Sequence, residues 1–106
     1  MADTLKRLET IIAARRTGDP AQSYVAKLTA KGRAKIAQKV GEEAVETVIA
    51  AMSDDREGLM KEAADLIFHL AILLADAGLT LEDVFAELDA RDGVSGLAEK
   101  AARKDG

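Results

Sequence analysis

The stretch 63–75 constrains the fold more than any other part of the chain, because it carries only two polar side chains, Asp65 and His69. Alanine and leucine, which are common in it, are strong helix formers. A helix that is apolar on nearly every side must be surrounded by other helices or by another chain. The stretch is too short to cross a bilayer, which takes about 20 apolar residues. We therefore expect a buried core helix and no membrane partner.

The composition excludes several classes of protein. Aromatic residues make up 3% of the chain and hydrophobic residues 48%, which favours helices over strands. The absence of cysteine excludes a disulfide scaffold, a thiol nucleophile, a zinc ribbon and an iron–sulfur site. The formal charge of −4 argues against a nucleic-acid binder. Residues 1–7 lack the apolar core of a signal peptide, so we expect a cytoplasmic protein.

Helix start and stop signals predict an all-α fold. A chain of 106 residues has the size of one domain, so we expect a single domain over 1–106, with a charged tail from about residue 93. Asp54 or Asp55 is expected to cap the helix that contains the stretch 63–75. The first predicted helix is capped by Thr4 and stops near Gly18, and a short piece capped by Ser23 is broken or bent at Gly32. Long helices follow over about 34–52 and 56–77, and Thr80 caps a last helix whose apolar positions run from Leu81 to Leu88.

The predicted helix over 34–52 has two unequal faces. Apolar side chains spread over most of its circumference, whereas one arc of roughly 100° is charged. Together with the stretch 63–75, it presents more apolar surface than the few helices of one chain can cover. We therefore expect a homodimer that completes an antiparallel bundle of four to five helices. The charged arc contains Lys35, Lys39, Glu42, Glu43 and Glu46.

Four carboxylates fall together if the two long helices form an antiparallel hairpin around Asp54. Residues at the same level then have numbers that sum to about 108. Glu46 faces Glu62, and Glu43 faces Asp65. The two acidic residues on each helix are spaced i, i+3 and therefore share a face. All four carboxylates lie within about 4.5 Å along the hairpin axis.

Such a cluster favours a metal site. Two carboxylates about 5 Å apart repel by roughly 3 kcal/mol at an effective dielectric constant of about 20, unless a cation lies between them or one is protonated. The alternative is a solvated face that Lys35 and Lys39 neutralise at helical spacing. An otherwise apolar helix, however, has no packing reason to carry acidic side chains. Oxygen ligands select Mg²⁺ or Mn²⁺, and the candidate ligands are Glu43, Glu46, Glu62 and Asp65.

Further side chains lie near the cluster in the predicted hairpin. His69 is level with Lys39, and it either donates a hydrogen bond to Asp65 one turn away or contacts the substrate. The Glu-x-x-His spacing of di-iron bundles is absent, which disfavours iron. Lys35 and Lys39 are suitable partners for phosphate, or else they belong to a solvated lysine face. Gly41 allows a ligand or another helix to approach closely.

The segments 38–46 and 61–69 resemble the phosphoribosyl-ATP pyrophosphohydrolase family, within the all-α nucleotide pyrophosphohydrolase superfamily. The first reads Gln-Lys-Val-Gly-Glu-Glu-Ala-Val-Glu and the second Lys-Glu-Ala-Ala-Asp-Leu-Ile-Phe-His. Together they carry the superfamily signature: Glu-Glu-x-x-Glu lies in the first segment and Glu-x-x-Asp in the second. The flanking Lys-Val-Gly and Phe-His, together with Ser23-Tyr24 and the tail segment 95–97, narrow the resemblance to this family.

The resemblance implies the second step of histidine biosynthesis. In that step, phosphoribosyl-ATP is hydrolysed to phosphoribosyl-AMP and pyrophosphate by a dimeric, Mg²⁺-dependent enzyme. The metal held by the four carboxylates would bridge phosphate oxygens. Glu42 is the candidate for orienting or deprotonating the attacking water. Lys35 and Lys39 are expected to steady the phosphates, and His69 is the third candidate substrate-binding residue.

Two other functions compete with this interpretation. A housekeeping pyrophosphohydrolase for ordinary or noncanonical nucleoside triphosphates would use the same carboxylates with a different base pocket. A non-catalytic helical dimerisation module would carry the acidic residues as a surface stripe. The first differs in substrate preference, and the second would bind no metal.

Overall fold

The computed structural model describes residues 2–92, and the charged tail that we expect from about residue 93 lies outside them. Across these residues the chain forms five α-helices and no strand, which confirms the all-α class. The helices are α1 (Ala2–Arg15), α2 (Tyr24–Lys31), α3 (Arg33–Met52), α4 (Arg56–Asp76) and α5 (Leu81–Ala90).

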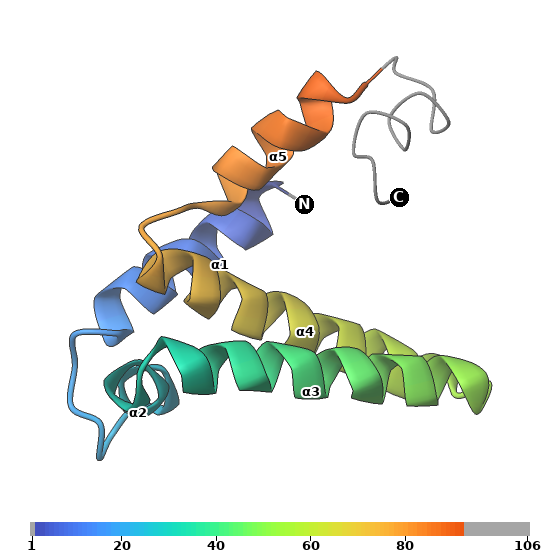
Figure 1. The fold of residues 1–106 in the computed structure, drawn as a ribbon, viewed down its shortest axis with the longest axis horizontal. Coiled ribbons are helices and arrows are strands. Elements are labelled where there is room, and N and C mark those ends of the chain that lie inside the picture. The colour runs from blue at the N-terminus through green and yellow to red at the C-terminus, as the bar shows by residue number, and fades with distance from the viewer. Residues whose placement is uncertain (1, 93–106) are drawn as a thin grey trace.

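The long helices α3 and α4 lie side by side and share the most extensive contact in the described chain (Figure 1). They are joined by a short turn over residues 53–55. The helix α1 packs against α4, and α2 packs against the start of α3 (Figure 1). The helix α5 bends away from α4 by 100°. One end of the α3–α4 pair is therefore covered by other helices, and the end near the turn is not.

The hydrophobic core lies where α1, α2 and the start of α5 meet the α3–α4 pair. Ile12, Ile36 and Ile72 are at most 1% exposed. Fully burying such a side chain stabilises the fold by about 1.5–3 kcal/mol. The same cluster contains Val25, Leu28, Ala71 and Leu81. This packing holds α2 against both long helices, and it thereby positions the residues at the start of α2.

Most of the predicted helix caps are present. Ser23 and Asp55 accept hydrogen bonds from backbone N–H groups three residues further on, at 3.2 Å and 2.9 Å. Thr80 forms a reciprocal capping box with the residue three positions after it. The prediction that Thr4 caps the first helix was wrong, because α1 already begins at Ala2. Thr4 lies inside the first turn, where its hydroxyl pairs with a nearby arginine rather than with a free backbone N–H.

Two glycines end helices as their positions predict. Gly32 and Gly78 have φ angles of 98° and 76°, in the region that L side chains rarely adopt. After Gly78, the Leu79 N–H donates to the Leu74 carbonyl at 2.8 Å, which satisfies a carbonyl left free at the end of α4. The chain can therefore turn sharply before α3 and again before α5.

Two side-chain contacts that the sequence analysis did not predict tie helix ends together. The Glu9 carboxylate on α1 accepts a hydrogen bond of 2.6 Å from the Leu81 N–H, the first residue of α5. Near the C-terminal end of α1, Asp76 pairs with Arg33 at 2.8 Å and with Arg16 at 3.5 Å. The second contact joins the end of α4 to the start of α3 and the segment after α1.

The apolar stretch 63–75 forms most of α4 and is covered unevenly. Ala71 and Ile72 are buried, whereas Ile67 is 43% exposed. The expectation that this helix is buried on nearly every side is therefore only partly met within one chain. In residues 2–92, no single helix is both long and apolar enough to cross a membrane, and α4 and α5 reach that threshold only together, across their bend of 100°.

An apolar face on the outer half of α3 stays exposed. Val48 is 59% exposed and Met52 is 81% exposed, and Val45 and Ile49 are exposed beside them. Gly41 precedes these residues on the same face, and a Cβ built on it would meet no atom within 4 Å. No described helix of this chain therefore explains a glycine at position 41.

Candidate active site

Three carboxylates from α3 and α4 converge along the helix pair. Glu43, Glu62 and Asp65 each offer one oxygen, and these three oxygens lie within 4.8 Å of one another. Glu43 comes from α3 and is only 7% exposed, whereas Asp65 on α4 is exposed. The helical spacing predicted this grouping, because it places residues 43 and 65 at the same level and residue 62 one turn away.

Glu46 is exposed and lies outside that group of three, but it is close to Glu62. The pKa of Glu62 is raised above its usual value, first by desolvation and then by the negative charge of Glu46. Glu43 and Asp65 raise it further. The fourth predicted member is thus next to the cluster, and the acidic groups repel one another in the absence of a cation.

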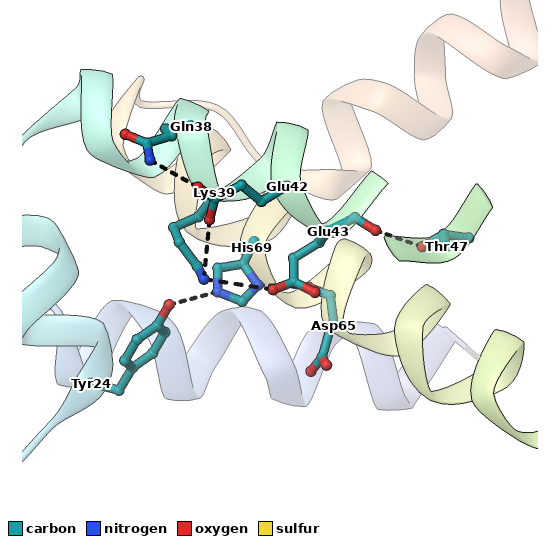
Figure 2. A network of polar contacts seen from close by, with 8 residues as sticks. All are labelled: Tyr24, Gln38, Lys39, Glu42, Glu43, Thr47, Asp65 and His69. Carbon is teal, nitrogen blue, oxygen red and sulfur yellow. Dashed lines mark hydrogen bonds and ion pairs between the residues drawn. The ribbon is translucent and has the colours of Figure 1, made fainter. Parts of the chain in front are cut away.

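Lys39 supplies positive charge to the cluster. Its ammonium lies 3.5 Å from Glu42 Oε1 and 3.7 Å from Glu43 Oε1 (Figure 2). Desolvation alone would lower the pKa of Lys39, but Tyr24 and the two glutamates outweigh it and raise that pKa. Lys39 therefore stays charged, and its position between helix α2 and the carboxylates suits an anionic ligand.

Glu42 is not one of the three clustered carboxylates. Its Oε2 accepts a hydrogen bond of 2.8 Å from Gln38, one turn earlier on α3 (Figure 2). This hydrogen bond, followed by the contacts with Lys39, lowers the pKa of the Glu42 carboxyl, and Lys35 lowers it slightly more. Glu42 is therefore ionised at neutral pH, and Lys35 lies near enough to act on the same carboxylate.

His69 is buried beneath these side chains, at 5% exposed. Its Nδ1 lies 2.8 Å from the backbone carbonyl oxygen of Asp65, and its Nε2 lies 2.7 Å from the hydroxyl of Tyr24 (Figure 2). The predicted hydrogen bond to Asp65 is therefore present, and it goes to the backbone. The ring of Phe68 packs against both aromatic neighbours, with its centroid 6.2 Å from that of Tyr24 and 5.3 Å from that of His69.

Tyr24 and Gln38 are the site residues that the sequence analysis did not assign. Gln38 was detectable, since it lies four residues before Glu42, where helix neighbours pair. Tyr24 directly follows the helix cap at Ser23, but only the packing of α2 on the long helices brings its hydroxyl to His69. Helical spacing says nothing about a contact between residues 45 positions apart.

The donors of the cluster fit a hard divalent cation. Carboxylate oxygens bind Mg²⁺ and Mn²⁺ in preference to softer metals. Opposite ligand oxygens of a six-coordinate Mg²⁺ lie about 4 Å apart, since each bond is about 2.0–2.1 Å. The three oxygens, within 4.8 Å of one another, need only small side-chain movements to reach this geometry. Glu43, Glu62 and Asp65 could therefore hold one metal ion between α3 and α4.

Comparisons with known proteins identify the family of the chain. A family model described as phosphoribosyl-ATP pyrophosphohydrolase matches residues 5–92. A protein of Rhizorhabdus wittichii named phosphoribosyl-ATP pyrophosphatase is 67% identical over 106 residues, which cover 100% of both chains. Proteins of the same name from Zymomonas mobilis and Erythrobacter litoralis are 62% and 61% identical, over 95% and 97% of this chain and 94% and 99% of theirs. The chain therefore belongs to the phosphoribosyl-ATP pyrophosphohydrolase family, a family of hydrolases.

Proposed function

We propose that this chain hydrolyses phosphoribosyl-ATP to phosphoribosyl-AMP and pyrophosphate, the second step of histidine biosynthesis, as a cytoplasmic homodimer. Family membership over residues 5–92 supports the choice of substrate. The observation that carries the chemistry is the convergence of three carboxylate oxygens within 4.8 Å on α3 and α4. A hydrolase that cleaves a phosphoanhydride needs such a site to neutralise the charge of the phosphates.

We assign Glu43, Glu62 and Asp65 as ligands of Mg²⁺, or of Mn²⁺, with Glu46 as the fourth. When bound, the metal would polarise the phosphate oxygens and neutralise the charge that develops on them. The raised pKa of Glu62 fits this role, because desolvation and then repulsion by the neighbouring carboxylates both disfavour the charged form, and a cation at the cluster would offset them.

The neighbouring side chains act on the water and on the phosphates. The lowered pKa of Glu42 keeps its carboxylate ionised, so that it can accept a hydrogen bond from the attacking water and orient it. Lys39, and more distantly Lys35, would bind phosphate oxygens as point charges. Both ring nitrogens of His69 are engaged within the chain, so its contribution to substrate binding would be indirect.

The dimer would complete the antiparallel helical bundle. The exposed face of α3, formed by Val45, Val48, Ile49 and Met52, is continuous along the helix, and residues 2–92 of the same chain leave it uncovered. A second copy that packs on this face would bury it, and Gly41 at its start would permit a close approach of the two backbones.

Turnover of a substrate panel tests the proposed function. Phosphoribosyl-ATP should be cleaved with a kcat/KM far above that for ATP or for a noncanonical triphosphate. Excess chelator should abolish pyrophosphate release, and Mg²⁺ should restore it. Glu62→Gln should be inactive, whereas Glu57→Gln on the exposed side of α4 serves as its matched control.

Two outcomes of this assay would contradict the proposal. Preference for a simple triphosphate would assign the chain to the housekeeping pyrophosphohydrolases. Absence of any turnover, together with no metal binding, would favour a non-catalytic dimerisation module.

A further inference from the structure

The single histidine of the chain is held from both sides. Nδ1 of His69 lies 2.8 Å from the Asp65 carbonyl oxygen, and Nε2 lies 2.7 Å from the Tyr24 hydroxyl. A carbonyl oxygen can only accept, so Nδ1 must carry the hydrogen. In the neutral ring Nε2 is then the acceptor, and the Tyr24 hydroxyl donates to it. The partners thus assign the tautomer.

This arrangement changes what the Tyr24 hydroxyl can do. A phenol has one hydrogen to donate, and here that hydrogen is directed at His69. The oxygen keeps its lone pairs and can accept a hydrogen bond, but it has no hydrogen left for a phosphate oxygen. Phosphate oxygens can only accept, so the group that makes a hydrogen bond to the Tyr24 oxygen must be a donor.

Lys39 is the donor beside it. Tyr24 and Lys39 lie near enough to alter one another's pKa, and both point toward the same space above His69 (Figure 2). An ammonium has three hydrogens, and the acceptors that the structure gives it are the carboxylates of Glu42 and Glu43. Glu43 is also one of the three clustered carboxylates, so a divalent cation bound there would draw on the same carboxylate as Lys39 and weaken its hold on the ammonium.

We propose that Tyr24 is a positioning residue: His69 fixes its hydroxyl as an acceptor, and that oxygen holds the Lys39 ammonium at the site when a metal ion takes the Glu43 carboxylate. Lys39 then remains in place to bind phosphate, and His69 acts on the substrate only through Tyr24 and Lys39. This inference rests on the proposed function, which supplies the metal and the phosphates.

Nitrogen NMR tests, without any enzyme turnover, whether His69 fixes the Tyr24 hydroxyl as an acceptor. Because His69 is the only histidine, a sample labelled with ¹⁵N-histidine gives one pair of ring signals. At about pH 8, Nδ1 should appear protonated and Nε2 should appear as an unprotonated acceptor. The Nε2 signal should move in Tyr24→Phe while Nδ1 stays protonated. The opposite tautomer, or an Nε2 signal that does not move in Tyr24→Phe, would overturn the assignment of Tyr24 as the donor to His69.

A double-mutant cycle tests whether the Tyr24 oxygen holds the Lys39 ammonium at the site. The probe is inorganic pyrophosphate in the presence of Mg²⁺, and calorimetry measures its affinity for wild type, Tyr24→Phe, Lys39→Met and the double variant. Tyr24→Phe should weaken binding about tenfold, the size expected for losing a hydrogen bond to a charged group. In the Lys39→Met background the same change should have an effect of less than about twofold. Equal effects in both backgrounds, or no binding of pyrophosphate to wild type, would contradict the proposal.

Paired substitutions of His69 separate this role from simple packing. His69→Gln keeps an acceptor oxygen near the place of Nε2, whereas His69→Met keeps only the volume. His69→Gln should therefore retain most of the pyrophosphate affinity, and His69→Met should lose about as much as Tyr24→Phe. Equal losses in the two variants would mean that His69 acts only by filling the core.

The outcomes also distinguish this inference from the proposed function. If wild type does not cleave phosphoribosyl-ATP but the cycle shows coupling between Tyr24 and Lys39, the proposed function fails and the positioning role stands. If wild type cleaves phosphoribosyl-ATP and the cycle is additive, only the positioning role fails. Lys61→Met, an exposed lysine that pairs with Glu57 on α4, is the control for the loss of one positive charge.

Discussion

At the scale of single residues, the candidate site is a set of acidic groups held closer together than their charges favour. Desolvation is the largest cause of the raised pKa of Glu62, and the negative charges of Glu46, Glu43 and Asp65 raise that pKa further. Such strain is common at functional sites, where a ligand relieves it. The metal-free protein should therefore be less stable with Glu62 than with a neutral side chain of the same shape.

Glu62→Gln should raise the thermal midpoint of the metal-free protein at pH 7. A carboxyl whose pKa is raised by folding contributes stability below its unfolded pKa of about 4.3, and this contribution is lost as pH rises through the folded pKa. The advantage of Glu62→Gln should therefore be present in chelator at neutral pH and vanish near pH 4. Thermal melts at the two pH values measure it.

Saturating Mg²⁺ should reverse the order of the two proteins, because wild type gains the energy of metal binding and Glu62→Gln has lost a ligand. Glu57→Gln is the matched control, since Glu57 is on the same helix but pairs at the surface with Lys61. A variant Glu62→Gln that is less stable than wild type in chelator at pH 7 would show that Glu62 is not under repulsion.

The residues of the carboxylate cluster could be predicted from the sequence, and the residues behind it could not. Glu43 and Asp65 were predicted to meet because two consecutive helices joined by a short turn have a fixed relation between their residue numbers. The contact between Tyr24 and His69 escaped prediction because α2 reaches α4 through a loop and a packing angle that local patterns do not encode. The role of His69 could therefore be predicted only as one of two alternatives.

At the scale of helices, the contacts at helix ends could be predicted where the two residues are close in sequence and not where they are far apart. The caps at Ser23 and Asp55 and the capping box at Thr80 involve residues three positions apart, so they could be predicted. The hydrogen bond from the Leu81 N–H to Glu9 joins positions 72 apart, and no sequence pattern near Leu81 predicts it. A carboxylate at a helix N-terminus is stabilised by the free N–H groups and the helix dipole.

Glu9→Ala should lower the free energy of unfolding by about 1–2 kcal/mol, the range for a lost helix cap. Glu9→Gln keeps an acceptor and loses only the charge, so it should cost about 0.3–1 kcal/mol. Urea denaturation gives both values. Hydrogen exchange at the Leu81 amide should accelerate in Glu9→Ala, and unchanged exchange there would show that this contact does not anchor α5.

At the scale of the whole molecule, apolar side chains are buried at one end of the α3–α4 pair and exposed toward the other. The core around Ile36 and Ile72 covers one end of the α3–α4 pair, whereas Val48 and Met52 toward the other end are 59% and 81% exposed. The surplus of apolar surface was evident from the sequence, because both long helices carry more apolar positions than one chain can cover. Which part of each helix stays uncovered depends on how α1 and α2 pack, and only the structure gives that.

Val48→Glu should convert the proposed dimer into a monomer at micromolar concentration, because it places a charge in the centre of the apolar face of α3. Sedimentation velocity measures the change. Ala14→Glu, on the exposed side of α1, introduces the same charge elsewhere and should leave the dimer intact. A wild-type protein that is monomeric and folded at this concentration, or a Val48→Glu protein that stays dimeric, would contradict the assignment of this face.

The central claim is that Glu43, Glu62 and Asp65 hold a divalent metal ion, and calorimetric titration tests it most directly. Mg²⁺ or Mn²⁺ added to wild type and to Asp65→Asn should bind the first and not the second, with Glu57→Gln binding as wild type does. Removing one of the clustered carboxylates from a site of hard-ion ligands should cost most of the affinity. Equal binding by wild type and Asp65→Asn, or no binding by wild type, would contradict the account.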